Sequence, residues 1–385
     1  MRNLIRWGVA VVVVLHGFIH LLGAAKGLGW ADISELKEPI STLMGAAWLT
    51  AGALVVLAGI LLPIMARWWW AVGVVAAAAS QVVILTSWSD AKTGTIVNLI
   101  LLVTAAHAFA AHGPASYRAE YLRRAHTLLS TQSPSGVVTE ADLAHLPEPV
   151  ATYVRKSGAI GQAPVTNFRA RVHGRIRAGK GKPWMTFTGE QVNTYGSDPA
   201  RLFFIDATMF GLPMDVLHVY VSSTATMRVK LCSLVPMVHA AGPEMDRSET
   251  VTVFNDLCLL APAALIDAPI TWQPIHANQV RGTLTNGTQS VTADLVFDTE
   301  GNLVDFISDD RARASQDGKS FTRERWSTPA PEFTTIGSRR LCSRGQACWH
   351  APDPVGQYPY IEISVDTITY NTSFGLATER AESPS

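Results

Sequence analysis

Four long apolar runs fill the first 112 residues, and they constrain the fold more than any other feature of the chain. They cover residues 5–25, 42–62, 68–87 and 94–112, and each approaches the ~20 residues that a helix needs to cross a bilayer core of ~30 Å. Only six of the 31 Lys and Arg residues and four of the 31 Asp and Glu residues lie in this part. The sequence therefore predicts a membrane α-helical bundle of four transmembrane helices over residues 1–112.

A cleaved signal peptide is the alternative interpretation of the first run. That run is long for the apolar part of a signal peptide, and three more such runs follow it. Basic residues in the short loops predict the orientation. With the N-terminus in the cytoplasm, that side carries Arg2, Arg6, Arg67, Arg118, Arg123 and Arg124, against Lys26, Lys37 and Lys92 on the other. We therefore predict a multi-pass protein of the bacterial cytoplasmic membrane with both termini in the cytoplasm.

Two histidines, His16 and His20, lie inside the first apolar run and share one face of the predicted helix. An ionisable residue within the membrane needs a partner and is a functional hypothesis by default. On the predicted topology, the loop after the third helix lies on the same side of the membrane as His20. Asp90, Lys92 and Asn98 are therefore the candidate partners of the two histidines.

Three interpretations of this polar cluster remain open. A metal ion would accept His16 and His20 but needs a third ligand such as Asp90. Haem needs axial histidines on different helices, and His107 lies at another depth. We favour the third interpretation, in which neutral imidazoles bond to polar groups of neighbouring helices and hold the bundle together. No cofactor is predicted, with metal or haem at His16 and His20 as the alternatives.

The second half of the chain has a different pattern. A basic juxtamembrane linker is predicted at residues 113–138. It leads to an antiparallel, β-rich soluble domain at residues 139–375, and residues 376–385 are predicted to be a disordered tail. In "NFRARVHGRIR" apolar or small residues alternate with polar ones, which indicates a half-buried strand with a basic outer face. That face is either solvated, paired with acids on a neighbouring strand, or in contact with anionic lipid head groups.

Similar alternation recurs in "WMTFTGEQV", "DVLHVYV", "MRVKL", "VRGTLT", "VTADLVFD", "LVDFIS" and "YIEISVDTITY". Asn286-Gly287 predicts a hairpin with a type I′ turn, and Gly301-Asn302 predicts a second hairpin. So many short strands form an antiparallel sheet that must curl or close. Residues 248–267 are predicted to form a helix that plugs or caps it. The fold class is thus a transmembrane bundle followed by an α+β domain with a curved, half-barrel-like antiparallel sheet.

No catalytic motif assigns a reaction, since a nucleophile elbow, a zinc-protease motif, a P-loop and a dinucleotide fingerprint are all missing from the sequence. Polar residues on the predicted 248–267 helix could face a cavity, and a helix cap is their alternative use. Ion pairing is the alternative for the charged candidates at 310 and 311, and core packing is the alternative for the aromatic ones. The candidate ligand-binding residues are Asn255, Asp256, Trp184, Trp272, Asp310 and Arg311.

The second half of the chain resembles a known family, and the order of several motifs along the chain supports this resemblance. "LPEPVATYVRKSG", "VTVFNDLCLLAPAALID", "LVDFISDDR" and "YIEISVDTITYN" are similar to an uncharacterised bacterial domain-of-unknown-function family that is often membrane-anchored. "HGFIHLLGAAKGLG" and "SWSDAKTGTIVNLI" resemble its four-helix N-terminal extension. The resemblance implies an architecture similar to the half-barrels of lipoprotein carriers and carries no activity with it.

Three functions remain open at this point. The first is a membrane-tethered module that binds a lipid or another apolar ligand, without a catalytic site. The second is a membrane enzyme or redox protein with its chemistry at His16, His20 and Asp90. The third is a scaffold or sensor that binds another protein. The expected partners are membrane lipids and an apolar small molecule, and no nucleic-acid partner is predicted.

Overall fold

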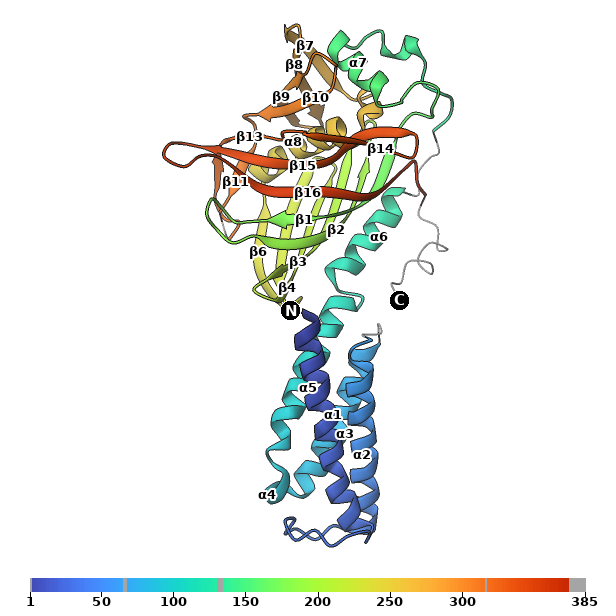
Figure 1. Cartoon of the computed structure of the whole chain (residues 1–385), viewed down its shortest axis with the longest axis vertical. Helices are drawn as coiled ribbons and strands as arrows, with labels where there is room; N and C mark the ends of the chain where they lie inside the picture. Colours follow the sequence, from blue (N-terminus) through green and yellow to red (C-terminus); the bar gives the residue numbers. More distant parts are fainter. Residues whose placement is uncertain (1, 65–67, 130–133, 316, 374–385) are drawn as a thin grey trace. The chain divides into compact units, whose positions relative to one another are not determined.

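The computed structural model describes residues 2–64, 68–129, 134–315 and 317–373. The chain forms two compact units, one of residues 1–119 with 232–234 and one of residues 120–231 with 235–385. Arg67 and the predicted tail at 376–385 lie outside the described residues. Figure 1 gives the element labels used below.

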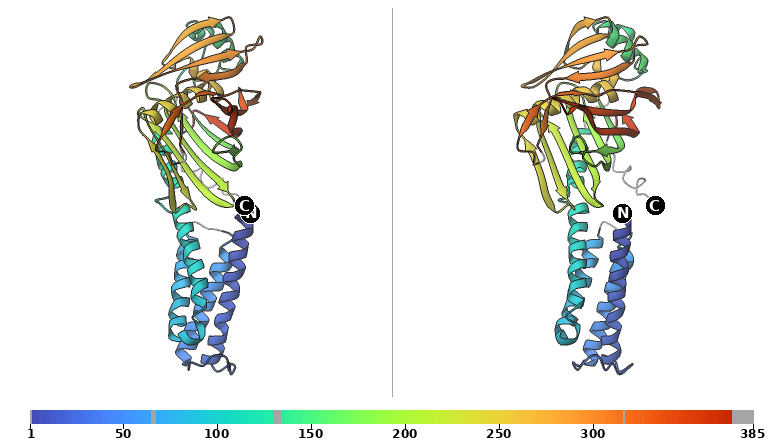
Figure 2. Two further views of the ribbon diagram at one scale, coloured as in Figure 1. Left: turned by 90° about the vertical axis from the view of Figure 1, so that its left-hand side faces the viewer. Right: turned by 60° about the vertical axis from the view of Figure 1, so that its left-hand side comes forward.

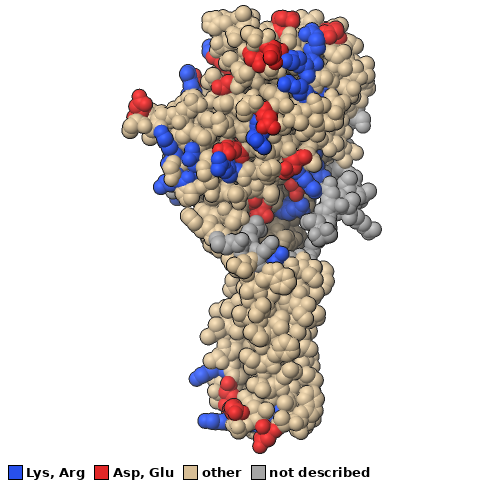
Figure 3. All heavy atoms as spheres, viewed as in Figure 1, with Lys and Arg blue, Asp and Glu red and all other residues tan. Residues whose placement is uncertain are grey.

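Four apolar helices dominate the first unit, as the sequence predicts. They are α1 (Arg2–Gly27), α2 (Thr42–Leu61), α3 (Trp69–Thr86) and α5 (Gly94–His112), and the short α4 (Trp88–Ala91) lies between the last two. Each of the four is long and apolar enough to cross a membrane. The surface of these helices carries charged side chains mainly near one end in the view of Figure 3. The following helix, α6 (Tyr117–Leu129), runs through the predicted linker.

Glycines let α1 and α2 approach closely. A Cβ atom placed on Gly17 would lie 2.6 Å from Val56 Cγ2, and one on Gly52 would lie 2.9 Å from the carbonyl oxygen of Gly17. Neither distance is compatible with a larger side chain in this packing. Small residues at such crossings are the usual means by which membrane helices bring their backbones into contact.

The second unit is built on one large antiparallel sheet (Figure 1). Its strand order is β6-β5-β4-β3-β2-β1-β16-β15-β13-β10-β9-β8-β7, with β14 paired to β15, while β11 and β12 form a separate pair. The bounds are β1 (Asn167–Ile176), β2 (Met185–Thr194), β3 (Ala200–Met209), β4 (Leu212–Val221), β5 (Thr224–Leu231), β6 (Val235–Ala241), β7 (Ile270–His276), β8 (Gln279–Asn286), β9 (Gln289–Phe297), β10 (Leu303–Ser308), β11 (Ala312–Ala314), β12 (Phe321–Arg323), β13 (Arg325–Ser327), β14 (Glu332–Ile336), β15 (Arg339–Ala351) and β16 (Gly356–Tyr370).

The sheet is open, because its edge strands β6 and β7 do not pair with each other. The connection between these two edges is α8 (Pro243–Leu260), followed by the short 3-10 helix η2 (Pro262–Leu265). Since it links opposite edges, α8 crosses the concave face of the curved sheet (Figure 2). A second 3-10 helix, η1 (Glu140–Leu143), and α7 (Glu148–Lys156) precede the first strand. The curved, half-barrel-like antiparallel sheet predicted from the sequence is confirmed.

Two local predictions were wrong in detail. The single helix expected at residues 248–267 ends at Leu260, because Pro262 cannot donate the next backbone hydrogen bond and begins η2 instead. The hairpin at Asn286 exists, but Asn286 pairs with Gln289 as the last residue of β8, and of the two loop residues only Gly287 has a positive φ. A type I′ turn needs a positive φ at both loop positions. The turn of this hairpin is therefore not of type I′.

The basic outer face of β1 is paired with acids on the neighbouring strand β16. Arg175 donates to both carboxylate oxygens of Glu362, at 2.7 and 2.8 Å, and His173 Nδ1 lies 2.6 Å from Asp366 Oδ1. Of the three interpretations of this face, cross-strand pairing is therefore the one that these two residues follow.

Candidate ligand-binding site

One face of α8 is polar although the helix is buried from Ser248 to Leu259. Ser248, Glu249, Thr252, Asn255 and Asp256 recur at the spacing of one helical face and are all buried. All five line a cavity between α8 and the concave side of the sheet. The opposite face of the helix is apolar and packs into the core. The helix therefore lies between the apolar core of the domain and a cavity to which it presents polar side chains.

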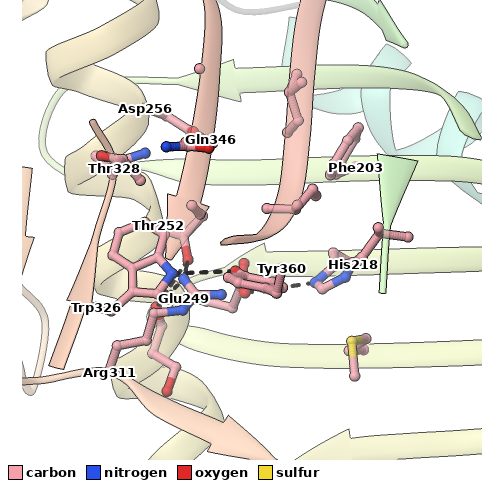
Figure 4. A pocket seen from close by; sticks show the side chains of 18 of the residues that line it. Phe203, His218, Glu249, Thr252, Asp256, Arg311, Trp326, Thr328, Gln346 and Tyr360 are labelled. Carbon is pink, nitrogen blue, oxygen red and sulfur yellow. Dashed lines mark hydrogen bonds and ion pairs between the residues drawn. The ribbon is translucent and has the colours of Figure 1, made fainter. Parts of the chain in front are cut away.

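The cavity has a volume of about 450 Å³, which falls within the range of small-molecule sites. Its lining residues come from α8, from β1–β6, from β11–β13 and from β15 and β16. Most of the sheet side is apolar or aromatic, including Val172, Ile176, Phe203, Ile205, Met227, Val238, Trp326, Tyr358, Ile361, Ile363 and Val365. The polar groups gather on α8 and the strands that face it (Figure 4).

A buried ion-pair cluster joins α8 to the sheet. Arg201 on β3 donates from Nη1 to Glu249 Oε2 at 3.1 Å and from Nε to Asp256 Oδ2 at 2.8 Å. Asp256 Oδ2 also accepts from Gln191 Nε2 at 2.7 Å and from Asn193 Nδ2 at 3.1 Å. Buried charges are tolerated only when they are paired and hydrogen-bonded in this way.

The charges of this cluster shift the pKa values of its members. Burial opposes ionisation of Glu249, but the charge of Arg201 outweighs it and holds the pKa of Glu249 well below its usual value. Burial lowers the pKa of Arg201, but the charges of Asp256 and Glu249 outweigh this effect and raise the pKa above its usual value. Both groups therefore remain charged at neutral pH. His218 Nδ1 lies 3.6 Å from Glu249 Oε1 on the other side of that carboxylate.

Arg311 lies at another part of the cavity wall. Its guanidinium carbon lies 4.5 Å from the centroid of the Trp326 ring, a cation–π arrangement. Its Nη1 donates to Thr252 Oγ1 and to the carbonyl oxygen of Ser248, both on α8. Trp326 is itself held by a 3.3 Å hydrogen bond from Nε1 to the Tyr360 hydroxyl. Figure 4 shows Arg311, Trp326 and Thr252 together in the cavity.

The structure brings three of the six predicted ligand-binding residues together and leaves three elsewhere. Asn255, Asp256 and Arg311 line the cavity, whereas the other three are absent from its lining. Trp184 stacks with the guanidinium groups of Arg175 and Arg177, Trp272 packs against Phe254 on the apolar side of α8, and Asp310 pairs with Arg247 and accepts from Thr292.

Sequence reasoning missed Arg201, His218 and Trp326, which lie on three different strands. Glu249 on α8 was not among the candidate residues either. A signal for Glu249 was present, because it lies seven residues before Asp256 and therefore on the same helical face. For the strand residues no such signal exists, since their approach to α8 depends on how the sheet curves.

A serine–histidine hydrogen bond elsewhere in the domain has the composition of a nucleophile and its base. Ser327 Oγ lies 2.8 Å from His350 Nε2 across neighbouring strands. Ser327 is fully buried and is not part of the cavity lining, so a substrate in the cavity does not reach it. This pair therefore has a structural role in joining β13 to β15.

The two histidines of α1 bond to polar groups of the neighbouring helices α3 and α5. His20 Nε2 lies 2.9 Å from Ser80 Oγ, and His20 Nδ1 lies 2.9 Å from the carbonyl oxygen of His16. His16 Nε2 lies 3.3 Å from both Ser80 Oγ and Asn98 Oδ1. All four side chains are buried. This geometry is the one expected when imidazoles join helices within a bundle.

Asp90 has other partners. It accepts hydrogen bonds from the backbone N–H groups of Lys37 and Glu38, at 2.6 and 2.9 Å. These bonds, with that from Glu38 as the largest cause, lower the pKa of Asp90. Lys92 is the C-cap residue of α4. Within the described ranges, no group of three or more His, Cys, Asp or Glu side chains could hold a metal ion.

Comparison with known proteins identifies the family. A family of unknown function, DUF6544, matches residues 136–363, which is more than half of the chain. The chain belongs to this family. The resemblance to an uncharacterised family predicted from the sequence is thereby confirmed. A search of proteins with curated descriptions gives no match.

Two solved structures are similar to the DUF6544 chain at low identity. A DUF1329 family protein from Desulfovibrio piger is 10% identical, with 60% of this chain and 95% of that chain covered and a TM-score of 0.35. A LolA superfamily protein from Nitrosomonas europaea is also 10% identical, with 60% of this chain and 93% of that chain covered and a TM-score of 0.33.

Proposed function

We propose that this protein is a membrane-tethered module that binds a lipid or another apolar molecule in the cavity beside α8. The single observation that carries the proposal is the cavity itself, about 450 Å³ in volume and largely apolar on its sheet side. Removing apolar ligand surface from water in such a cavity favours binding by about 25 cal/mol per Å². Binding of this kind needs no catalytic residue and no cofactor.

The apolar helices of the first unit support the tether in this proposal. They would anchor the chain in the cytoplasmic membrane with both termini in the cytoplasm, on the distribution of Lys and Arg along the sequence. The bilayer would then supply the ligand. The polar contacts of His16 and His20 fit a role in holding the helices together, so we place the binding function in the second unit.

A variant that fills the cavity tests the proposal. Ala347 on β15 lines the cavity and is 6% exposed, so Ala347→Phe places a ring in its volume. The full-length protein is purified in a neutral maltoside detergent, and its non-covalent adducts are measured by native mass spectrometry. We expect the wild type to retain a lipid-sized adduct, and Ala347→Phe to lose most of it.

Thr335→Phe is the matched control, because Thr335 is exposed on the neighbouring strand β14 and does not line the cavity. It should retain the adduct at the wild-type level. Equal adducts in all three proteins would place the bound lipid on the membrane helices and overturn the proposal. An identical loss in both variants would assign the effect to a damaged fold and would also count against it.

A further inference from the structure

Arginines in this domain bind carboxylates in one repeated way. In six of them, Nε and Nη2 donate side by side to the two oxygens of an Asp or Glu, which is the bidentate geometry that guanidinium groups form with planar anions. The pairs are Arg155–Glu140, Arg175–Glu362, Arg281–Asp294, Arg313–Glu324, Arg323–Glu244 and Arg325–Asp309.

Arg311 presents the same edge without an anion. Its Nη1 is used by the Thr252 hydroxyl and the Ser248 carbonyl of α8. Its Nε is buried and has no acceptor among the described residues, and none of the described hydrogen bonds involves its Nη2. A buried donor without a partner costs about 1–3 kcal/mol. The Nε/Nη2 edge of Arg311 is therefore held in one orientation, and no described residue supplies an acceptor for its Nε.

The surrounding charges favour an anion at this edge. The two carboxylates that line the cavity, Glu249 and Asp256, are both bound to Arg201. Of the two other lining arginines, Arg313 is paired with Glu324, and Arg177 donates from Nε to the carbonyl oxygen of Pro359 and stacks on Trp184. Arg311 forms no ion pair with the acids of the described residues, although its charge is among those that lower the pKa of Glu249. It lies on the Trp326 ring, which fixes its plane. It is thus a half-buried cation with a fixed orientation on the wall of a cavity whose sheet side is largely apolar.

We propose that the ligand is an amphiphile with an acidic head group, a carboxylate or a phosphate, which the Nε and Nη2 atoms of Arg311 bind. Its apolar chain then lies along the sheet side of the cavity, where Val172, Ile361 and Val365 contribute to the lining. This inference rests on the proposed binding function and adds the chemical class of the ligand to it. An alcohol or an ester of the same chain would leave the Arg311 edge without its anion.

Photolabelling of the full-length protein in phosphatidylcholine nanodiscs tests the inference. The probes are a diazirine-bearing palmitic acid and the matching diazirine-bearing fatty alcohol, and the labelled peptides are quantified by mass spectrometry. Labelling of the four membrane helices in the same sample corrects for partition of each probe into the bilayer. We expect the acid to label the cavity strands on the order of tenfold to a hundredfold more than the alcohol, from the strength of charge-assisted hydrogen bonds.

Variants then locate the head group. Arg311→Gln should reduce labelling by the acid to the level of the alcohol, and Arg311→Lys, which keeps the charge and loses the planar edge, should give an intermediate ratio. Arg325→Gln is the control, because Arg325 pairs with Asp309 at the surface and is 56% exposed. Its ratio should equal that of the wild type. Displacement by unlabelled oleate or by oleyl phosphate tells a carboxylate from a phosphate.

The outcomes separate the two proposals. Equal labelling of the cavity by acid and alcohol in the wild type would overturn the head-group inference and leave the binding function standing. Loss of the acid preference in Arg325→Gln, or its persistence in both Arg311 variants, would also overturn it. Absence of cavity labelling by either probe would overturn the proposed function itself.

Discussion

Replacing Arg201 by Met is expected to destabilise the second unit strongly, because it leaves two buried carboxylates without their cation. Glu249 is 2% exposed and would keep the imidazole of His218, whose Nδ1 lies 3.6 Å from Oε1, and the charge of Arg311, which acts on it without an ion pair. Asp256 would keep its amide donors Gln191 and Asn193. Removing one member of a buried ion pair typically costs about 3–5 kcal/mol. At ~2–4 °C per kcal/mol for a unit of this size, the midpoint of thermal unfolding should fall by roughly 6–20 °C.

The pH dependence of this loss provides a sharper test. In the wild type the pKa of Glu249 is lowered, so its contribution to stability is present above the unfolded value of 4.5 and is lost as the pH falls through the folded pKa. Without Arg201, burial dominates and raises that pKa. The variant then gains stability relative to the wild type as the carboxylate is protonated. We expect a larger difference in midpoint at pH 8 than at pH 5.

Intrinsic tryptophan fluorescence of the full-length protein in detergent, recorded on heating, measures both effects. The control is Arg281→Met, whose partner Asp294 is 21% exposed while Arg281 is 48% exposed. Surface ion pairs contribute about 0–1 kcal/mol, so this variant should melt near the wild-type temperature. A loss in Arg201→Met no greater than in the control, or one equal at pH 8 and pH 5, would refute the reasoning.

Three further predictions concern other parts of the molecule. Burial raises the pKa of Asp305 to about 6, so ionisation of this carboxyl group lowers the stability of the folded state as the pH rises through that value. Asp305→Asn should therefore melt at a higher temperature than the wild type at pH 8 but not at pH 4. After allowance for solvent screening the gain is on the order of 1 kcal/mol. Gly17→Ala brings a Cβ atom to 2.6 Å from Val56 and should destabilise the bundle by about 1–3 kcal/mol. Gly8→Ala is the control, because Gly8 has open space around it, and it should not destabilise the bundle. Equal melting temperatures of the two variants, measured by circular dichroism, would contradict this prediction. Ser80→Ala removes a hydroxyl that contacts both membrane histidines and should cost about 1 kcal/mol in the same measurement, while an unchanged midpoint would show that these contacts do not hold the bundle together.

Local patterns in the sequence predicted the secondary structure well where one pattern dominates. The four apolar runs gave helices whose ends lie within a few residues of the prediction, since bilayer thickness sets their length. The alternation in "NFRARVHGRIR" gave strand β1, since one face of that strand is buried. A local sequence pattern gave the wrong prediction where a contact with a residue far along the chain determines the conformation. Asn286 stays in its strand, and its side chain donates to Tyr220 at 2.8 Å.

The chain by itself determined that it carries membrane-length helices and a curved antiparallel sheet, because hydrophobic length and period are local properties. It also placed Asn255 and Asp256 on one helix beside each other. Only the tertiary structure decided what they face. The open sheet sends α8 from one edge to the other across the concave side. This crossing brings the helix to Arg201 on β3 and to Arg311 in the connection between β10 and β11. Such long-range contacts have no local period in the sequence, because they depend on how the whole sheet curves.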